Sequence, residues 1–432
     1  MVSIENDVKQ AREASFLMSS LTEEEKNRSL MEIKKQLFEK REQIFAANQK
    51  DLLKSEQNHL STPLMKRLKF DENKLAEIID GISSLEKLPD PIGQSLFSRE
   101  LDQDLELYRV SCPLGVIGVI FESRPDALVQ IAVLCLKTGN SVILKGGSEA
   151  FHTNRILAEI IEKAGEISGL PAGWIHLWET RDQVEKMLDF NEYIDLLIPR
   201  GSNAFVRHIM DHTSIPVLGH ADGVCHLYIH EEAETEMALR LALDSKTQYA
   251  AVCNAAETIL IDNSIAKNIL PGLAKILKEK DVQIYGCEKT AEILEDILPV
   301  EAWHHEYLDY KISIRIVSGF EEAIKHINTY GSGHTDCIVT ENNDAARIFM
   351  RMVDSGNVYW NCSTRFSDGF RYGFGAEVGV STSKIHARGP VGLEGLVTYK
   401  YLLFGKGQIV SDYVEGKTTF THIPISLDKR KW

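Results

Sequence analysis

The chain has 432 residues, of which 44% are hydrophobic and 26% charged, and its formal net charge is −15 at pH 7. This acidic balance argues against a nucleic-acid-binding surface and against binding to an anionic membrane. No apolar run reaches the roughly 20 residues that a membrane helix requires, and the length predicts roughly two or three substructures.

The cysteines indicate the compartment. Seven of them are dispersed without a CxxC pair, and the first residues lack the basic and apolar regions of a secretory signal. An odd, dispersed set in a long chain is typical of a reducing environment rather than of a disulfide framework. We therefore expect a cytoplasmic protein.

The first elements are predicted to be helical, and strands begin near residue 98. Thr22 and Glu25 have the spacing of a capping box, and apolar residues then recur at helical spacing. Residues 105–110 alternate as in a strand, and residues 116–121 form a short apolar run typical of a buried strand. Pro125 then stands where the first turn of a helix tolerates proline.

Two glycine-containing turns follow buried-strand patterns farther along. Residues 141–144 precede Lys145-Gly146-Gly147-Ser148, residues 195–198 precede Pro199-Arg200-Gly201-Ser202, and a helix is predicted after each turn. Such alternation predicts a parallel, doubly wound α/β sheet, whose ligands bind beyond the carboxyl ends of the strands.

These turns suit a phosphate. Glycines let the backbone approach it, the start of a helix favours anions, and Lys145 adds a cation. The alternative is a plain strand-to-helix turn with a solvated lysine, because no GxGxxG or Walker pattern is present.

Residues 245–257 bring a cysteine, a lysine, an amide and a carboxylate together between two apolar stretches. Their sequence is SKTQYAAVCNAAE. A thiolate that attacks a carbonyl carbon needs hydrogen-bond donors for the developing oxyanion. The Asn254 amide and the backbone N–H groups after Cys253 are candidates. The alternative is that Cys253 is simply a small buried hydrophobic residue.

Seven ordered tracts between about residues 5 and 412 closely resemble the gamma-glutamyl phosphate reductase family, within the aldehyde dehydrogenase superfamily. They are PLGVIGVIFESRPDALVQIA (113–132), SVILKGGSEA (141–150), IPRGSNAFVR (198–207), IPVLGHADGVCHLYI (215–229), SKTQYAAVCNAAET (245–258), VYWNCSTRFSDG (358–369) and GFGAEVGVSTSKIHARGPVGLEGLVTYKY (373–401). The resemblance implies the NADPH-dependent reduction of L-glutamate 5-phosphate to glutamate 5-semialdehyde and phosphate, in proline biosynthesis. Cys253 matches the nucleophile, which would hold a glutamyl thioester for hydride delivery.

The resemblance also implies a cofactor site. Lys145 falls where the superfamily places its ribose-binding lysine. Many NAD-specific relatives carry a glutamate three residues later, whereas the neutral Ser148 here permits a 2′-phosphate. The expected NADP(H)-binding residues are Lys145, Gly146, Ser148, Gly201, Ser202 and Glu306. Asp309 stays open as the alternative to Glu306 for the acid that binds the nicotinamide ribose.

Two departures from ordinary aldehyde dehydrogenases support chemistry with phosphate. Ser123, with Arg124 beside it, replaces the oxyanion asparagine, and residues 219–225 (GHADGVC) offer no clear base for thioester hydrolysis. The expected substrate-binding residues are Arg124, Ser363, Thr364, Arg365 and Arg388, with His386 and His220 as further candidates. Each of them is as readily a structural residue.

The expected fold is an aldehyde dehydrogenase-like α/β architecture with two doubly wound domains and a β-hairpin oligomerisation element. Residues 1–98 and 113–230 would form the NADPH-binding domain, residues 231–397 the catalytic domain, and residues 99–112 and 398–432 the oligomerisation hairpin and the C-terminal strand and tail. The hairpin and terminal strand would pair with another subunit in a homodimer or larger oligomer. The acyl phosphate would come from a separate glutamate 5-kinase.

Three alternatives stay open. Cys225, His226 and His230 cluster in sequence, but neighbouring residues of a strand point to opposite faces, so no metal site is expected. A non-phosphorylating aldehyde dehydrogenase or acyl-CoA reductase of the same fold is one rival function. An inactive cofactor-binding scaffold is the other.

Overall fold

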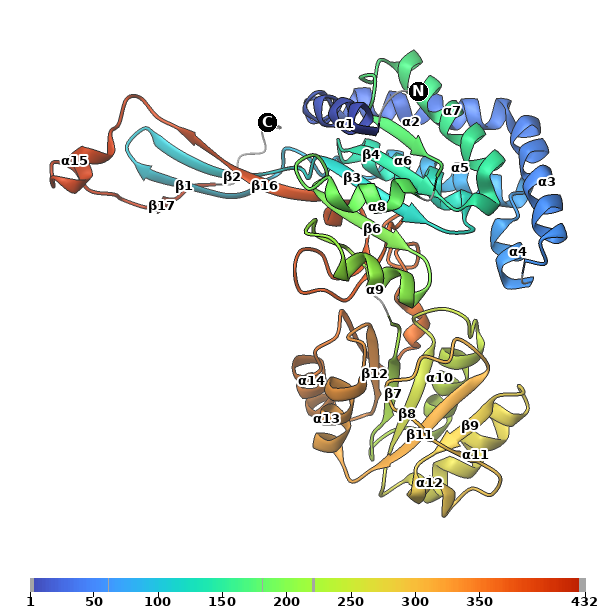
Figure 1. Cartoon of the computed structure of the whole chain (residues 1–432). Helices are drawn as coiled ribbons and strands as arrows, with labels where there is room; N and C mark the ends of the chain where they lie inside the picture. Colours follow the sequence, from blue (N-terminus) through green and yellow to red (C-terminus); the bar gives the residue numbers. More distant parts are fainter. Residues whose placement is uncertain (1–3, 61, 181, 220–221, 427–432) are drawn as a thin grey trace.

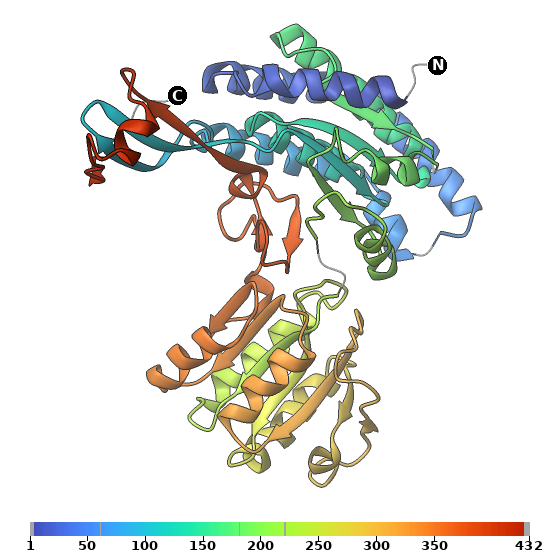
Figure 2. The ribbon, with the colours of Figure 1, turned by 60° about the vertical axis from the view of Figure 1, so that its left-hand side comes forward.

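The computed structural model describes residues 4–60, 62–180, 182–219 and 222–426. Two α/β units lie one above the other, and an extended arm projects from the upper unit (Figures 1 and 2). Within the described ranges, no helix is both long and apolar enough to cross a membrane. Two doubly wound units and an arm confirm the expected fold class.

The upper unit begins with five helices: α1 (Ile4–Met18), α2 (Glu23–Glu39), α3 (Arg41–Gln57), α4 (Thr62–Leu68) and α5 (Glu72–Lys87). The predicted capping box is present, because the Thr22 side chain accepts from the Glu25 N–H and the Glu25 carboxylate accepts from the Thr22 N–H. The apolar face of α2 packs into the same core as the first sheet.

The first sheet has the strand order β5-β4-β3-β6 and is parallel throughout. Its elements are β3 (Val116–Phe121), α6 (Pro125–Lys137), β4 (Ser141–Gly146), α7 (Phe151–Ser168), β5 (Ile175–Trp178), α8 (Asp182–Asp189), β6 (Leu196–Arg200) and α9 (Asn203–Asp211). Strand β3 is paired with β4 on one side and β6 on the other. The turns after all three strands therefore meet at one edge, where the chain order of the strands reverses.

The lower unit contains a second parallel sheet, of order β10-β9-β11-β8-β7-β12-β13. Its strands are β7 (Cys225–Ile229), β8 (Ala256–Asp262), β9 (Gln283–Gly286), β10 (Leu298–Pro299), β11 (Lys311–Val317), β12 (Thr335–Val339) and β13 (Asn357–Trp360). Its helices are α10 (Thr235–Thr247), α11 (Ala266–Lys278), α12 (Glu288–Ala291), α13 (Phe320–Tyr330) and α14 (Asn343–Met352).

One expected boundary needs correction. The expected border between the NADPH-binding and catalytic domains lies after residue 230, at the acidic run of residues 231–234, but β7 already pairs with β8 and β12 of the lower sheet. The change of sheet therefore falls between β6 and β7, and the acidic run only joins β7 to α10.

The arm is a four-stranded antiparallel sheet of order β16-β2-β1-β17. It consists of β1 (Ser95–Asp102), β2 (Leu105–Pro113), β16 (Val397–Phe404) and β17 (Ile423–Pro424), with the short helix α15 (Val410–Val414) near its tip. The predicted hairpin and terminal strand are both present. They pair with each other within one chain, through β2 and β16.

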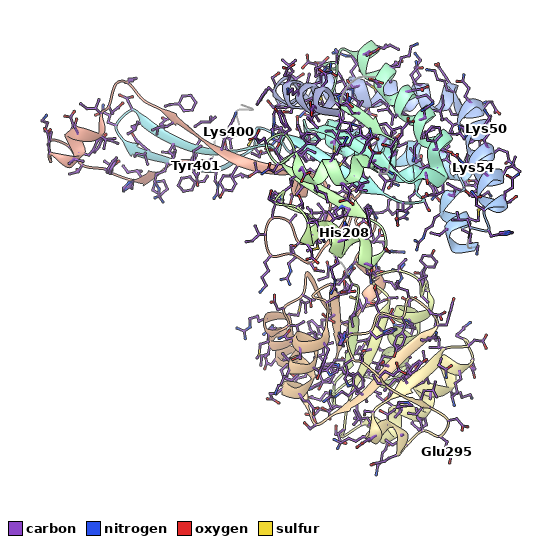
Figure 3. All side chains as sticks on the ribbon, in the orientation of Figure 1. Lys50, Lys54, His208, Glu295, Lys400 and Tyr401 are labelled. Carbon is purple, nitrogen blue, oxygen red and sulfur yellow. The ribbon has the colours of Figure 1, made fainter. Side chains whose placement is uncertain are left out.

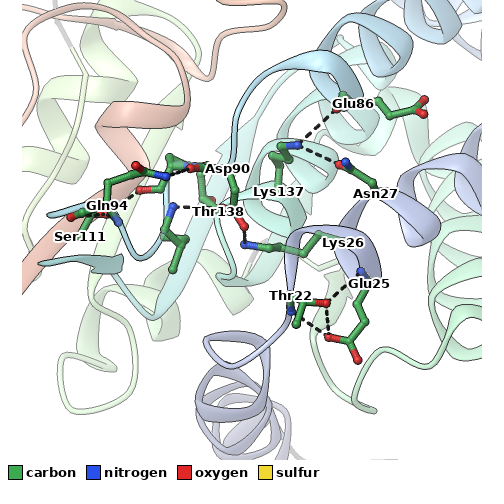
Figure 4. Close-up of polar contacts among 12 residues, drawn as sticks. Thr22, Glu25, Lys26, Asn27, Glu86, Asp90, Gln94, Ser111, Lys137 and Thr138 are labelled. Atoms are coloured by element: carbon green, nitrogen blue, oxygen red, sulfur yellow. Dashed lines mark hydrogen bonds and ion pairs between the residues drawn. The ribbon is translucent and has the colours of Figure 1, made fainter. Parts of the chain in front are cut away.

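A buried polar network fixes the base of the arm to the helical part of the upper unit (Figure 4). Lys26 of α2 and Asp90 form an ion pair with Nζ and Oδ2 2.6 Å apart, and the two side chains are only 1% and 7% exposed. Asp90 also accepts a hydrogen bond from the backbone N–H of Ile92, at 3.0 Å. Nearby, Ser111 of β2 accepts from the Gln94 N–H and donates to the Pro91 carbonyl.

The chain returns to the upper unit before it enters the arm for the last time. After η2 (Thr364–Phe366), the short strands β14 (Gly379–Ser381) and β15 (Gly389–Val391) and the turn η3 (Leu393–Leu396) follow. Val378, Val391 and Leu396 join the hydrophobic core of the upper unit. The buried Asn140 amide donates to the Leu396 carbonyl at 2.8 Å and fixes this return segment.

Candidate active site

Cys253 lies in residues 248–255, the segment that joins the end of α10 to the start of β8 and is called the Cys253 loop below. The thiol-bearing residue is half-buried. Its carbonyl oxygen accepts a hydrogen bond from the buried Cys225 Sγ at 3.1 Å, and the carbonyl of Asn254 accepts from Thr364 Oγ1 at 2.7 Å. Gly223 packs so closely that an added Cβ would lie 2.4 Å from the Cys253 carbonyl oxygen. The backbone of the Cys253 loop is thus held from three sides.

The Asn254 side chain points inward. It is only 6% exposed, and its Nδ2 donates to the Ser367 carbonyl at 2.8 Å. Its Oδ1 is buried and has no hydrogen-bond partner among the described residues. The Asn254 amide was a candidate hydrogen-bond donor to the oxyanion. In the structure, this amide instead donates to the backbone of the segment after β13.

The residues after β13 pack against the Cys253 loop. Ser363 and Thr364 are 3% and 0% exposed, and their hydroxyl groups serve internal contacts, because that of Ser363 accepts from Ser245 and that of Thr364 donates to the Asn254 carbonyl. The Arg365 side chain donates from Nε to Gln248 at 3.0 Å. Burial lowers the pKa of Arg365, whereas the nearby Cys253 raises it. Of these three candidates, Arg365 thus brings a charge to the nucleophile.

A buried ion pair flanks the same loop. Lys246 Nζ and Glu257 Oε2 are 2.7 Å apart, and both side chains are fully buried. Burial raises the pKa of Glu257 to about 7, against the lowering effect of Lys246. Burial also lowers the pKa of Lys246. Sequence analysis noted both charges beside Cys253 but gave neither of them a role.

In the upper unit, the strand register brings the turn after β3 to the turn after β4. Ser123, with a φ of +47°, donates from its backbone N and its Oγ to Glu149 Oε1, at 2.5 and 2.8 Å. The same carboxylate covers Gly147, where an added Cβ would lie 2.0 Å from Oε1. Ser123 is thus buried and held by a carboxylate. Sequence analysis missed Glu149, although it stands in the tract that predicted the phosphate turn.

Lys145 and Ser148 lie side by side in the chain but differ in exposure. The Lys145 side chain is 8% exposed and its Nζ donates to the Gly146 carbonyl at 2.6 Å, whereas Ser148 is exposed. The turn after β6 lies close by, because the Glu122 N–H, in the turn after β3, donates to the Arg200 carbonyl at 3.1 Å. Burial and Glu149 raise the pKa of Glu122, whereas the Ser202 N–H and Lys145 lower it. The expected cofactor turns are therefore brought together.

The turn after β6 begins α9. Ser202 is the N-cap and accepts from the Phe205 N–H, and an added Cβ on Gly201 would lie 2.9 Å from Glu122 Oε2. The preceding Arg200 donates to the Val378 carbonyl at 2.8 Å. Burial and then Arg124 lower the pKa of Arg200, and Cys253 is among the groups that raise it. The charge of Arg200, at the carboxyl end of β6, is therefore close enough to Cys253 to interact with it electrostatically.

The structure separates the two candidate acids for the nicotinamide ribose. Glu306 Oε2 accepts from Asn203 Nδ2 at 2.5 Å, at the first residue of α9. Asp309 instead pairs with Lys311 at 3.2 Å and accepts from the Tyr310 N–H, and these contacts lower its pKa. Only Glu306 reaches the turn that carries Gly201 and Ser202.

The other candidates lie apart or serve structural contacts. Arg124 is exposed at the start of α6. Arg388 donates twice to Asp354, to Oδ1 and to the carbonyl oxygen, both at 2.9 Å. The ring of His386 contacts the Gly395 carbonyl. His220 lies outside the described residues. Sequence matching thus located Arg388 on the chain but not its partner.

The described residues hold no group of three or more His, Cys, Asp and Glu side chains with metal-site geometry. In β7, Cys225 bonds to the Cys253 carbonyl, whereas the His226 ring pairs with Asp336 at 2.9 Å. The two side chains thus serve different contacts.

Comparison with known proteins agrees with this geometry. The model of the aldehyde dehydrogenase family matches residues 2–285. The gamma-glutamyl phosphate reductase of Acetivibrio thermocellus is 58% identical over 98% of both chains, and that of Ruminiclostridium cellulolyticum is 60% identical over 95% of both. A crystal structure of the enzyme from Thermotoga maritima superposes with a TM-score of 0.91 at 38% identity, covering 94% of this chain and 99% of that one. The chain therefore belongs to the gamma-glutamyl phosphate reductases (glutamate-5-semialdehyde dehydrogenases), oxidoreductases of the aldehyde dehydrogenase family.

Proposed function

We propose that this chain reduces L-glutamate 5-phosphate with NADPH through a thioester on Cys253. The observation that carries the proposal is the half-buried thiol on a loop that is fixed from three sides and is contacted by the Arg365 side chain. The Cys253 thiolate attacks the acyl carbon, and the bond to phosphate breaks as the thioester forms. Hydride then adds to the thioester carbon, and the tetrahedral anion collapses to the aldehyde and the free thiolate.

The residues at the two turns fit a phosphorylated nicotinamide cofactor. Lys145 would contact the ribose, the start of α9 would favour the pyrophosphate, and Glu306 would accept from the nicotinamide ribose. The exposed Ser148 presents a hydroxyl where a carboxylate would repel a 2′-phosphate. When bound, NADPH supplies the hydride.

Cations near Cys253 suit an anionic substrate. Arg365 and Arg200 both interact electrostatically with Cys253, and charge-assisted hydrogen bonds to phosphate are among the strong ones. We therefore assign the substrate phosphate to the side of Cys253 on which Arg365 and Arg200 lie. Ser123 and Arg124, after β3, would face the acyl oxygen.

Hydrolysis of the thioester is disfavoured. The carboxylate of Asp222, in the tract before Gly223, is bound by Arg207 at 2.6 Å and by Asn203 at 3.1 Å. Both oxygens of this carboxylate are thus engaged in contacts within the protein. This contact opposes the rival function of a non-phosphorylating aldehyde dehydrogenase.

The decisive experiment is NADP reduction by the purified protein given glutamate 5-semialdehyde, with and without inorganic phosphate. We expect activity that requires phosphate and is lost in Cys253→Ala. Reduction of NADP without phosphate would favour the hydrolytic rival. Inactivity of the wild-type protein would favour the cofactor-binding scaffold.

We also propose that the arm joins subunits in a homodimer or larger oligomer, in the cytoplasm. Strand β16 is an edge strand, and alternate residues of it, Tyr399, Tyr401 and Leu403, are 50%, 57% and 57% exposed. Figure 3 labels Tyr401 on the arm. An exposed apolar edge strand calls for a cover. Light scattering should give at least twice the chain mass of 48.6 kDa, and a monomer at assay concentration would contradict the proposal.

A further inference from the structure

The buried pair of Lys246 and Glu257 brackets the Cys253 loop. Lys246 lies in the last turn of α10, and Glu257 is the second residue of β8. Their charged atoms are 2.7 Å apart, and neither side chain is exposed. The pair therefore clamps together the two ends of the segment that carries the nucleophile.

The second carboxylate oxygen of Glu257 reaches another loop. Oε1 accepts from the backbone N–H of Leu308 at 3.2 Å, and Leu308 has a φ of +51°, in the region that non-glycine residues seldom occupy. Two residues earlier, Glu306 accepts from Asn203 at the start of α9. One carboxylate thus ties the Cys253 loop to the segment that carries the expected ribose-binding acid.

Stability alone does not explain such a pair. Removing two charges from water is costly, and replacing a buried ion pair by apolar residues is often neutral or stabilising. The positions of Lys246 in α10 and Glu257 in β8 could each have been filled by an apolar side chain, as four of the seven positions of β8 are. What the pair adds is a fixed geometry, because each oxygen has one directed partner.

We propose that Glu257, together with Lys246, is a positioning residue that sets the Cys253 loop against the segment bearing Glu306. The pair acts through these loops and does not touch the reacting atoms. This inference rests on the proposed function, in which Cys253 and the cofactor must lie at a set distance.

The test replaces the whole pair with apolar residues of similar size, Lys246→Met with Glu257→Met. We expect kcat of phosphate-dependent NADP reduction to fall about 10²-fold, because a misplacement of ~1 Å costs about that much. KM for NADP should change far less. Labelling of Cys253 by iodoacetamide, followed on its peptide by mass spectrometry, should become severalfold faster as the loop opens. Glu257→Gln keeps an acceptor for the Leu308 N–H and should lie between the wild type and the double variant in both measurements.

The chain offers a matched control in Lys26 and Asp90. That pair is equally short and nearly as buried, and its carboxylate also holds one backbone N–H, but it lies at the base of the arm. The double variant Lys26→Met with Asp90→Met should keep the kcat and the Cys253 labelling rate of the wild type, even if its midpoint of thermal unfolding changes.

The inference is overturned if the Lys246 and Glu257 double variant keeps both kcat and the labelling rate of the wild type. It is equally overturned if both double variants lose activity in proportion to their loss of thermal stability. Should the first double variant fail to fold, Glu257→Gln decides by the same two measurements. The labelling experiment needs no substrate, so it tests the positioning even if wild-type protein shows no phosphate-dependent activity and the proposed function fails.

Discussion

Gly223→Ala should disable the enzyme without touching a reacting group. An added Cβ would lie 2.4 Å from the Cys253 carbonyl oxygen, 2.5 Å from its Cα and 2.6 Å from its Cβ. Ordinary contacts of a Cβ begin at 3.4 Å, so the two segments must separate by about 1 Å. Because these neighbours are backbone atoms and the Cβ of the nucleophile itself, the displacement reaches Cys253 directly.

A shift of ~1 Å at a nucleophile costs about 10² in rate, and overpacking costs about 1–3 kcal/mol of stability. Steady-state kinetics of phosphate-dependent NADP reduction should therefore show a fall in kcat of about that size, with urea unfolding giving the stability. Gly219→Ala is the matched control from the same segment, because its Cβ would meet only Pro199, at an ordinary 3.7 Å. If folded Gly223→Ala turns over as fast as the wild type, the packing of Gly223 does not position the nucleophile.

Three further predictions concern other contacts. Glu149→Ala removes the acceptor of two hydrogen bonds from Ser123 and should lower kcat/KM about tenfold, whereas Glu149→Gln retains most activity; equal losses would contradict this role. Burial lowers the pKa of His326 to about 3, so below pH 6.5 the unfolded chain binds a proton that the folded chain refuses. At 1.36 kcal/mol per pKa unit, the free energy of unfolding measured by urea titration should fall by about 2 kcal/mol from pH 6.5 to 5, and this fall should be absent in His326→Asn. The same pH dependence in His326→Asn and the wild type would refute the prediction. Glu306→Gln should raise KM for NADP about tenfold, whereas Asp309→Asn should not, and the reverse order would show that the ribose-binding acid is misassigned.

The strands were the most predictable part of the fold. The sequence predicts a buried strand at residues 116–121 and a C-terminal strand within residues 398–432, and the structure has β3 at Val116–Phe121 and β16 at Val397–Phe404. Central strands of a parallel sheet are covered on both faces, so they read as continuous apolar runs. Such an apolar run does not indicate to which sheet the strand belongs. The border between the units was therefore expected after β7 instead of before it.

Contacts across the sheet could not be read from the chain. Phe121 pairs with Gly146 on one side and with Arg200 on the other, and this register brings the turn after β3 to both glycine turns. Through this register Glu149 binds Ser123, and Glu122 lies against Gly201. Ser123 and Gly201 had been named as site residues from the sequence. The family tracts named Arg365, which the structure ties to Gln248 in the Cys253 loop, but they gave no partner for Arg388, which the structure ties to Asp354.

The return of the chain near residue 390 bears on how this protein is made. The core of the upper unit is completed by Val378, Val391 and Leu396, residues translated long after its sheet. While the ribosome is still synthesising the lower unit, the emerging upper unit has an uncovered apolar surface. The upper unit therefore cannot complete its core until the last tenth of the chain has been made, and a fragment that ends before residue 378 would leave that core open.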